Sequence, residues 1–171
     1  MQEVIVKIKR LDKELELPSY ITETDAGLDL RAAEDVEIKS NQQKTVRCGI
    51  IIEIPSGHVG FLKDRAGIVS KMKVHVVAGT IDSGYRGEVS VVLFNLGNDD
   101  ILIERGMRIA QMVIMPVIKV KLQEVDTITP TKRGSKGFGS TGMKEITMDN
   151  FKEIEQGLKE IYEKGKKLSQ K

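Results

Sequence analysis

Apolar and β-branched residues alternate with polar ones, or form short unbroken runs, along most of this chain. These runs cover residues 4–8, 35–38, 45–54, 59–62, 74–78, 89–94, 101–103 and 109–125. Turn residues separate them, as in Pro55-Ser56-Gly57 after the third run. Strands this frequent, with no helical period between them, predict an all-β sandwich or barrel and argue against a βαβ fold.

One predicted hairpin carries more chemistry than a chain reversal needs. Its first arm ends at Ile81-Asp82, Ser83-Gly84 forms the turn, and Tyr85 and Arg86 precede the apolar run 89–94. A carboxylate, a flat ring and a cation therefore lie close together. Taken alone, such a segment is more often a surface hairpin with a solvated carboxylate and a packed ring.

Composition narrows the classes of function. The 171 residues are one domain's length, with 40% hydrophobic and 30% charged residues and a net charge of +2. This charge is too small to indicate nucleic-acid binding, and the sequence has no apolar run of membrane-spanning length, so we expect neither partner. The single Cys48 is typical of a reducing, cytoplasmic location. Two histidines and one cysteine leave a metal such as Mg²⁺ only oxygen ligands, chiefly those of a phosphate substrate.

Four more glycine-punctuated segments accompany the hairpin. They occupy residues 25–30 (DAGLDL), 64–71 (DRAGIVSK), 106–111 (GMRIAQ) and 133–142 (RGSKGFGSTG). One such segment is weak evidence, but the five in this order resemble the five motifs of the trimeric dUTPase family, over residues 20 to 142. The resemblance implies a jelly-roll-like β-barrel of the β-clip type, a homotrimer with active sites shared between subunits, and hydrolysis of dUTP to dUMP and pyrophosphate. It also implies a cellular role: keeping uracil out of DNA and supplying dUMP for dTMP synthesis.

The same resemblance assigns the catalytic and metal residues. Asp82 is similar to the general base that orients and activates the water attacking the α-phosphorus. Gln111 resembles the residue that helps to fix this water or an α-phosphate oxygen. Asp29 resembles the carboxylate that holds waters of the Mg²⁺ shell, the ion itself being held mainly by substrate phosphates. Asp25 is closer to the turn and less suited to this role.

Substrate contacts follow from the resemblance in the same way. Arginine guanidinium groups and glycine N–H groups suit the phosphates. A slot formed by main-chain groups suits uracil, and an aromatic ring under the deoxyribose excludes a 2′-hydroxyl. A closing arm stacks on the base. The residues at these positions are Arg65, Ala66, Gly67 and Arg108 for the phosphates, Val76, Val77, Gly79, Ile81 and Tyr85 for the nucleoside, and Arg133, Gly137, Phe138, Gly139, Ser140 and Thr141 on the arm.

Three positions depart from the family pattern. Ala66 stands where a serine usually follows the arginine, which removes a phosphate hydrogen bond worth on the order of 1–3 kcal/mol in the transition state. Asp64 stands where proline is common and places a carboxylate near the phosphates. Gly84 replaces a frequent second aspartate, so Asp82 is the only carboxylate of the turn. These changes affect the expected rate rather than the reaction type.

The chain divides by composition into three parts. We expect a β-barrel over residues 1–126 and a mobile arm with the glycine-rich motif over 127–142. Residues 143–171 are predicted to add an amphipathic helix outside the resemblance, since Asn150 and Glu153 form a capping-box pattern and apolar residues recur at three- and four-residue spacing. The hypothesis for this helix is that it packs on the trimer.

Two other functions compete with this interpretation. A dCTP deaminase has the same fold, but it carries a glutamate three residues before the equivalent of Asn95, where this chain has Val92. Valine cannot move protons to a cytosine ring, which argues against deamination. A non-catalytic, nucleotide-sensing module is motivated by Ala66 and the added helix, and turnover of dUTP discriminates it from an enzyme. A plain β-scaffold explains none of the motifs.

Overall fold

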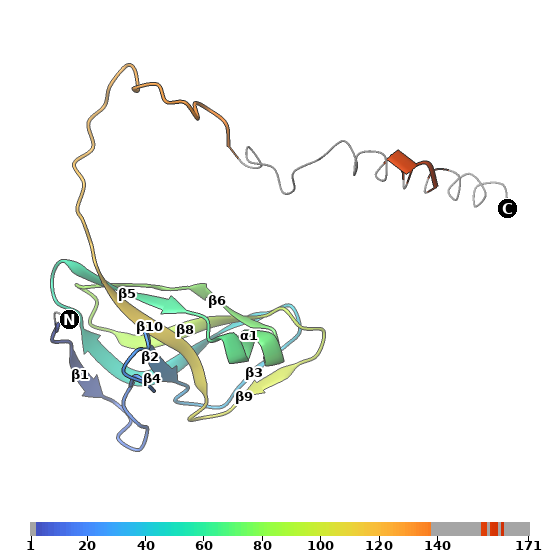
Figure 1. Cartoon of the computed structure of the whole chain (residues 1–171). Coiled ribbons are helices and arrows are strands. Elements are labelled where there is room, and N and C mark those ends of the chain that lie inside the picture. Colours follow the sequence, from blue (N-terminus) through green and yellow to red (C-terminus); the bar gives the residue numbers. More distant parts are fainter. Residues whose placement is uncertain (1–2, 138–154, 157, 161, 163–171) are drawn as a thin grey trace. The chain divides into compact units, whose positions relative to one another are not determined.

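The structure is a computed structural model that describes residues 3–137, 155, 156, 158–160 and 162 (Figure 1). The chain forms two compact units, residues 1–121 and residues 122–171. The first unit holds the strands and one helix. Their bounds are β1 Lys7–Arg10, β2 Leu28–Arg31, β3 Val36–Ile38, β4 Gln43–Glu53, β5 His58–Lys63, α1 Ala66–Met72, β6 Val74–Ala78, β7 Thr80–Asp82, β8 Glu88–Asn95, β9 Ile101–Ile103 and β10 Arg108–Pro116.

The strands form two four-stranded antiparallel sheets and a two-stranded one. One sheet has the order β1-β4-β8-β6, the other β2-β10-β5-β7, and β3 pairs with β9. Burial alternates residue by residue along β8, with Val89, Val91 and Leu93 turned inward. This is the pattern of a strand with one face on a core. The unit is therefore mainly β-sheet, as the sequence predicts.

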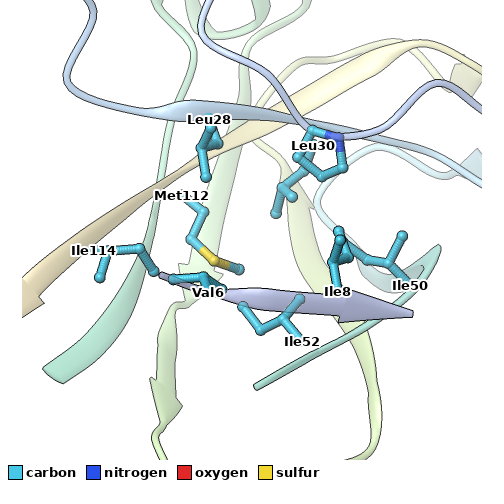
Figure 2. Close-up of a pocket in the computed structure, with 9 residues that line it drawn as sticks. Val6, Ile8, Leu28, Leu30, Ile50, Ile52, Met112 and Ile114 are labelled. Atoms are coloured by element: carbon cyan, nitrogen blue, oxygen red, sulfur yellow. The ribbon is translucent and has the colours of Figure 1, made fainter. Parts of the chain in front are cut away.

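The two larger sheets face each other across the core. Figure 2 shows apolar side chains of both sheets around a small cavity of about 120 Å³. Those labelled are Val6, Ile8, Ile50 and Ile52 on the side of β1 and β4, and Leu28, Leu30, Met112 and Ile114 on the side of β2 and β10. Most of these side chains are buried or half-buried, whereas Ile8 on the edge strand β1 is 40% exposed. Burial of apolar surface is the main favourable term holding the sheets together.

The predicted runs 74–78 and 101–103 match β6 and β9 residue for residue, but two expectations on local structure are wrong. Residues 66–72 form the helix α1, whose only buried residue is Ile68, so the segment carries no apolar helical period to detect. The last predicted strand ends at Pro116 instead of residue 125. Beyond it, Ile118 and Val120 are exposed, at 88% and 76%.

The prediction that residues 81–94 form a hairpin is also wrong, because the two predicted arms belong to different sheets. β7 pairs with β5, with Asp82 opposite Val59, whereas β8 pairs with β4 and β6. The chain therefore crosses from one sheet to the other around the Ser83-Gly84 turn. Sheet membership depends on distant strands, and the local turn signal does not contain it.

The second unit is described only in part. Residues 122–137 contain no regular strand or helix, and the described residues Glu155, Gln156, 158–160 and Tyr162 have helical backbone. Lys159 Nζ lies 2.9 Å from Glu155 Oε1, an i,i+4 pair typical of a helix. The rest of the predicted helix, Asn150 included, lies outside the described residues. In the part of the chain that the structure describes, no helix has the length and apolar character needed to cross a membrane.

Candidate active site

Arg65 and Asp29 form the centre of the candidate site. Arg65 directly precedes α1, and Asp29 lies on β2 with 9% of its surface exposed. Arg65 Nε donates a hydrogen bond of 2.7 Å to Asp29 Oδ1, and a terminal nitrogen of the same guanidinium lies 3.4 Å from the carbonyl oxygen of Arg108. A charge-assisted bond to a buried carboxylate fixes the direction of the guanidinium.

The second carboxylate oxygen of Asp29 is left open. Asp29 Oδ2 is buried and accepts no hydrogen bond from the described residues. A terminal nitrogen of Arg108 lies 3.5 Å away, close enough for Coulomb attraction but without hydrogen-bond geometry. A buried carboxylate oxygen without a donor suits a water molecule, including one from a hydrated cation.

A groove opens beside this pair. It has a volume of about 450 Å³ and carries four cationic side chains, from Arg31, Arg65, Lys71 and Arg108. Gly67 and Gly106 also line it, and a Cβ built on either glycine meets nothing within 4 Å. Cations and open backbone in one groove are what a polyphosphate chain requires. Ala66, the first residue of α1, is exposed, and both of its sequence neighbours, Arg65 and Gly67, line the groove.

Sequence reasoning missed Arg31 and Lys71. Arg31 follows the motif of residues 25–30, and one of its terminal nitrogens donates a bond of 2.9 Å to the carbonyl oxygen of Gly106; it also pairs with Glu16. Lys71 is in the last turn of α1. The signal for both was their position at the end of a glycine-punctuated segment. Asp25, in contrast, is a turn cap: hydrogen bonds from the Thr22 side chain and backbone lower its pKa.

Gln111 joins this group. It lies on β10 directly opposite Asp29 on β2 and opposite Lys63 on β5. Its side-chain amide donates a bond of 2.7 Å to the carbonyl oxygen of Asp64. A Cβ at Gly27 would lie 2.6 Å from Gln111 Oε1, so the glycine leaves room for the Gln111 side chain at this point. The structure thus brings Asp29, Arg65, Arg108 and Gln111 together.

The strand β6 carries the predicted base-reading residues. The Val76 N–H donates a bond of 2.7 Å to Asp64 Oδ1, so Val76 anchors the strand to the loop before α1. The register against β8 shifts between Val76 and Ala78, which leaves Val77 as a bulge residue, 45% exposed. A bulge leaves its extra residue unpaired and available for another partner.

Gly79 and Ile81 hold the next part of the chain against β5. The carbonyl oxygen of Gly79 accepts a bond of 2.8 Å from the Leu62 N–H, and a Cβ on Gly79 would lie 2.6 Å from the Leu62 carbonyl oxygen. Only glycine fits such a close approach of two backbones. Ile81 is half-buried opposite Gly60.

Asp82 and Tyr85 lie on an exposed turn at the sheet edge. The Tyr85 N–H donates to the Asp82 carbonyl oxygen at 3.0 Å, and the Tyr85 hydroxyl donates to the Glu88 carbonyl oxygen at 2.9 Å. Asp82 is exposed, and Tyr85 is 44% exposed. Both side chains are therefore open to solvent in the single chain, although the Tyr85 hydroxyl is bonded back to the turn.

This turn is remote from the groove within one chain. Asp82 is opposite Val59 on β5, whereas Gln111 is opposite Lys63 on the other side of the same strand. This register separates Asp82 from Gln111 by about 13 Å along the strands and by two strand spacings, about 10 Å, across them. A small ion or water cannot touch both groups in the isolated chain.

Of the predicted arm residues, the structure describes Arg133 and Gly137. Arg133 Nε donates a bond of 3.1 Å to the carbonyl oxygen of Lys136 within the same turn. Phe138, Gly139, Ser140 and Thr141 lie outside the described residues. Among the described residues, no cluster of three or more His, Cys, Asp or Glu side chains could hold a metal ion.

Comparisons with known proteins identify the family and the fold of this chain. The family model described as dUTPase matches residues 13–142. Deoxyuridine 5′-triphosphate nucleotidohydrolase of Gloeothece citriformis is 46% identical over 140 residues, covering 81% of this chain and 97% of that protein. A variant dUTPase of Staphylococcus bacteriophage 80alpha, solved with dUpNHpp, has a TM-score of 0.76 and 29% identity over 81% of this chain and 99% of its own. The dUTPase of phage phi11 of S. aureus, whose variant structure concerns a structural Mg(II) ion, shares the fold with a TM-score of 0.69 and 24% identity, over 73% of this chain and 99% of its own.

Proposed function

The chain belongs to the dUTPase family, and we propose that it hydrolyses dUTP to dUMP and pyrophosphate through a water molecule activated by Asp82. The observation that carries this proposal is the groove, which four cationic side chains line and in which one of them, Arg65, is paired with the buried Asp29. A nucleoside triphosphate supplies the negative charge that this groove lacks.

The groove residues bind and orient the triphosphate. Arg65 is held by Asp29 in a fixed direction, so its remaining N–H groups are set for phosphate oxygens without further ordering. Arg108 supplies a second guanidinium. Asp29 Oδ2, open and buried, fits a water of a Mg²⁺ shell, and Mg²⁺ bound mainly by the phosphates neutralises their charge.

Asp82 takes the proton of the attacking water. The water oxygen forms a bond to the α-phosphorus, the bond from that phosphorus to the bridging oxygen breaks, and pyrophosphate leaves with the electron pair. Gln111 orients the water or an α-phosphate oxygen. Tyr85 lies under the deoxyribose and leaves no room for a 2′-hydroxyl, while main-chain groups of residues 76–79 recognise uracil.

The active site is completed by other copies of the chain. The separation of Asp82 from Gln111 in one chain supports sites shared between copies of the chain, because a second copy can bring its turn to the groove. The number of copies that we propose, three, is the one that the family resemblance implies. The exposed apolar residues Ile118, Val120 and Leu122 support assembly as well, since monomeric proteins seldom expose such runs. Arg133 and the arm through Thr141 close over the nucleotide.

Pyrophosphate release from dUTP, dCTP, dTTP and UTP with Mg²⁺ tests this function. We expect selective turnover of dUTP, and a loss of about 10³-fold in kcat for Asp82→Asn. Asp99→Asn, on the exposed turn after β8, is the matched control and keeps full activity. Turnover that survives Asp82→Asn would assign the base to another group, and binding of dUTP without turnover would indicate a nucleotide-sensing module.

The cellular role follows from the reaction. Removal of dUTP keeps uracil out of DNA and supplies dUMP for dTMP synthesis. We place the enzyme in the cytoplasm, which the buried, unpaired Cys48 supports, because a free thiol suits a reducing compartment.

A further inference from the structure

Asp64 connects three parts of the candidate site, yet the proposed reaction assigns it no role. Its Oδ1 accepts the Val76 N–H at 2.7 Å, and its Oδ2 lies 2.6 Å from His75 Nδ1. Its carbonyl oxygen accepts the side-chain amide of Gln111 at 2.7 Å. Its neighbour in sequence is Arg65, the groove arginine.

The side chain of Asp64 closes the loop that contains α1. This loop leaves β5 at Lys63 and enters β6 at Val74, and both ends meet at the Asp64 carboxylate. A carboxylate accepts hydrogen bonds, so the contact of 2.6 Å fits the His75 tautomer that carries its proton on Nδ1. Two donors on one carboxylate fix β6 relative to the loop more firmly than either bond alone.

We infer that Asp64 is a positioning residue that anchors the base-recognition strand through the Val76 N–H. The inference rests on the proposed function, in which residues 76–79 recognise uracil. The residue after the anchored Val76 is Val77, which bulges out of the β6–β8 ladder with 45% exposure. A slot built of main-chain groups rejects the wrong base only while the backbone that forms it is held in place.

Steady-state kinetics with dUTP and dCTP test this role in Asp64→Ala, Asp64→Asn and His75→Leu. Asp64→Ala removes both hydrogen bonds and is expected to raise KM for dUTP by about tenfold, and to lower the dUTP-to-dCTP ratio of kcat/KM by a similar factor, with a smaller change in kcat. Asp64→Asn keeps an acceptor for the Val76 N–H and should stay within about threefold of the native values. His75→Leu keeps the anchor and should behave like Asp64→Asn.

Hydrogen exchange of the Val76 amide reports the anchor without activity. We expect slow exchange in the native protein and in Asp64→Asn. Exchange should be faster in Asp64→Glu, because its longer side chain misplaces the acceptor. Asp64→Glu also replaces Asp64→Ala in the experiment if Asp64→Ala does not fold. Asp99→Ala controls for the loss of a carboxylate.

Two results would overturn the inference. One is native KM and native selectivity in Asp64→Ala; the other is an effect of Asp64→Asn or His75→Leu equal to that of Asp64→Ala. Failure of the proposed function is distinct, because it shows as absent dUTP turnover in the native chain or as persistent turnover in Asp82→Asn.

Discussion

The groove and the turn that carries Asp82 are built in opposite ways. Beside the groove, Asp29 is buried at 9% exposure and its charge is matched by the groove residue Arg65 at 2.7 Å. On the turn, Asp82 and Tyr85 are exposed, and the described hydrogen bonds of the turn run mostly between its own residues. The groove is therefore preorganised by its own chain, whereas the groups of the turn are left exposed in the single chain, as the proposed sharing of sites between copies requires.

Co-expression of two inactive variants tests this division most strongly. Arg65→Ala removes the groove arginine and Asp82→Asn removes the proposed base, so each alone should lose nearly all turnover. If the sites are shared, random mixed assemblies combine an intact groove with an intact turn and should recover up to about a quarter of native activity. The measurement is pyrophosphate release by the purified mixture.

The control for that mixture is the double variant carrying both substitutions in one chain. It cannot form a complete site in any assembly and should stay inactive when mixed with either single variant. If the co-expressed pair assembles but recovers no turnover, the groove and the turn of one chain serve the same site.

A matched pair of substitutions compares stability in the two regions. Asp29→Ala leaves the guanidinium of Arg65, 27% exposed, without its partner and should lower the free energy of unfolding by about 2 kcal/mol. Asp82→Ala makes the same chemical change on the exposed turn and should cost less than about 0.5 kcal/mol. Urea unfolding with equal m-values gives both numbers. Equal losses would show that the turn is held as firmly as the groove.

The buried thiol of Cys48, close to the end of this turn, should give the stability of the protein a specific pH dependence. Glu88, at the end of the turn, accepts the Gly49 N–H at 2.9 Å, next to Cys48. Burial, with a smaller effect from Glu88, raises the pKa of the Cys48 thiol to about 12. The unfolded thiol loses its proton near pH 8.5, so above that pH the unfolded state binds fewer protons and stability falls.

Unfolding of native protein and of Cys48→Ala at pH 9 to 11 measures this effect. The native chain should lose about 1.4 kcal/mol per pH unit more than the variant, with the loss ending near the folded pKa. Subtraction of the variant removes the contribution of lysine and tyrosine titration. Parallel pH profiles would indicate that the thiol is open to solvent.

The sequence predicted strands better than their partners. The apolar runs at β6 and β9 were found to the residue because alternation is a local signal. The helix α1 was missed because it buries only Ile68 and Arg65 offers no capping side-chain bond. The placement of β7 and β8 in separate sheets was missed because it depends on β5 and β4, distant in sequence.

The same limit applies to the candidate site. The resemblance of the motifs to those of the family pointed to Asp29, Arg65, Arg108 and Gln111, and the fold brings these four residues together. The contact of Asp64 with Val76 joins the end of β5 to β6 across α1, so no motif contains it. A residue that acts through hydrogen bonds to other elements has no sequence pattern of its own.

Two glycine substitutions give the finest comparison of the groove with the turn. Gly27→Ala places a Cβ 2.6 Å from Gln111 Oε1 and 3.0 Å from Gln111 Cβ, so the Gln111 side chain must shift, and the free energy of unfolding should fall by about 1 kcal/mol. Gly84→Ala meets nothing within 4 Å and should change stability by less than about 0.5 kcal/mol. Thermal unfolding of both variants decides the point. Gly27→Ala should also lower kcat, because Gln111 is displaced in this variant and not in Gly84→Ala. A native kcat in Gly27→Ala would show that the groove tolerates movement of the Gln111 side chain as readily as the turn tolerates a methyl group.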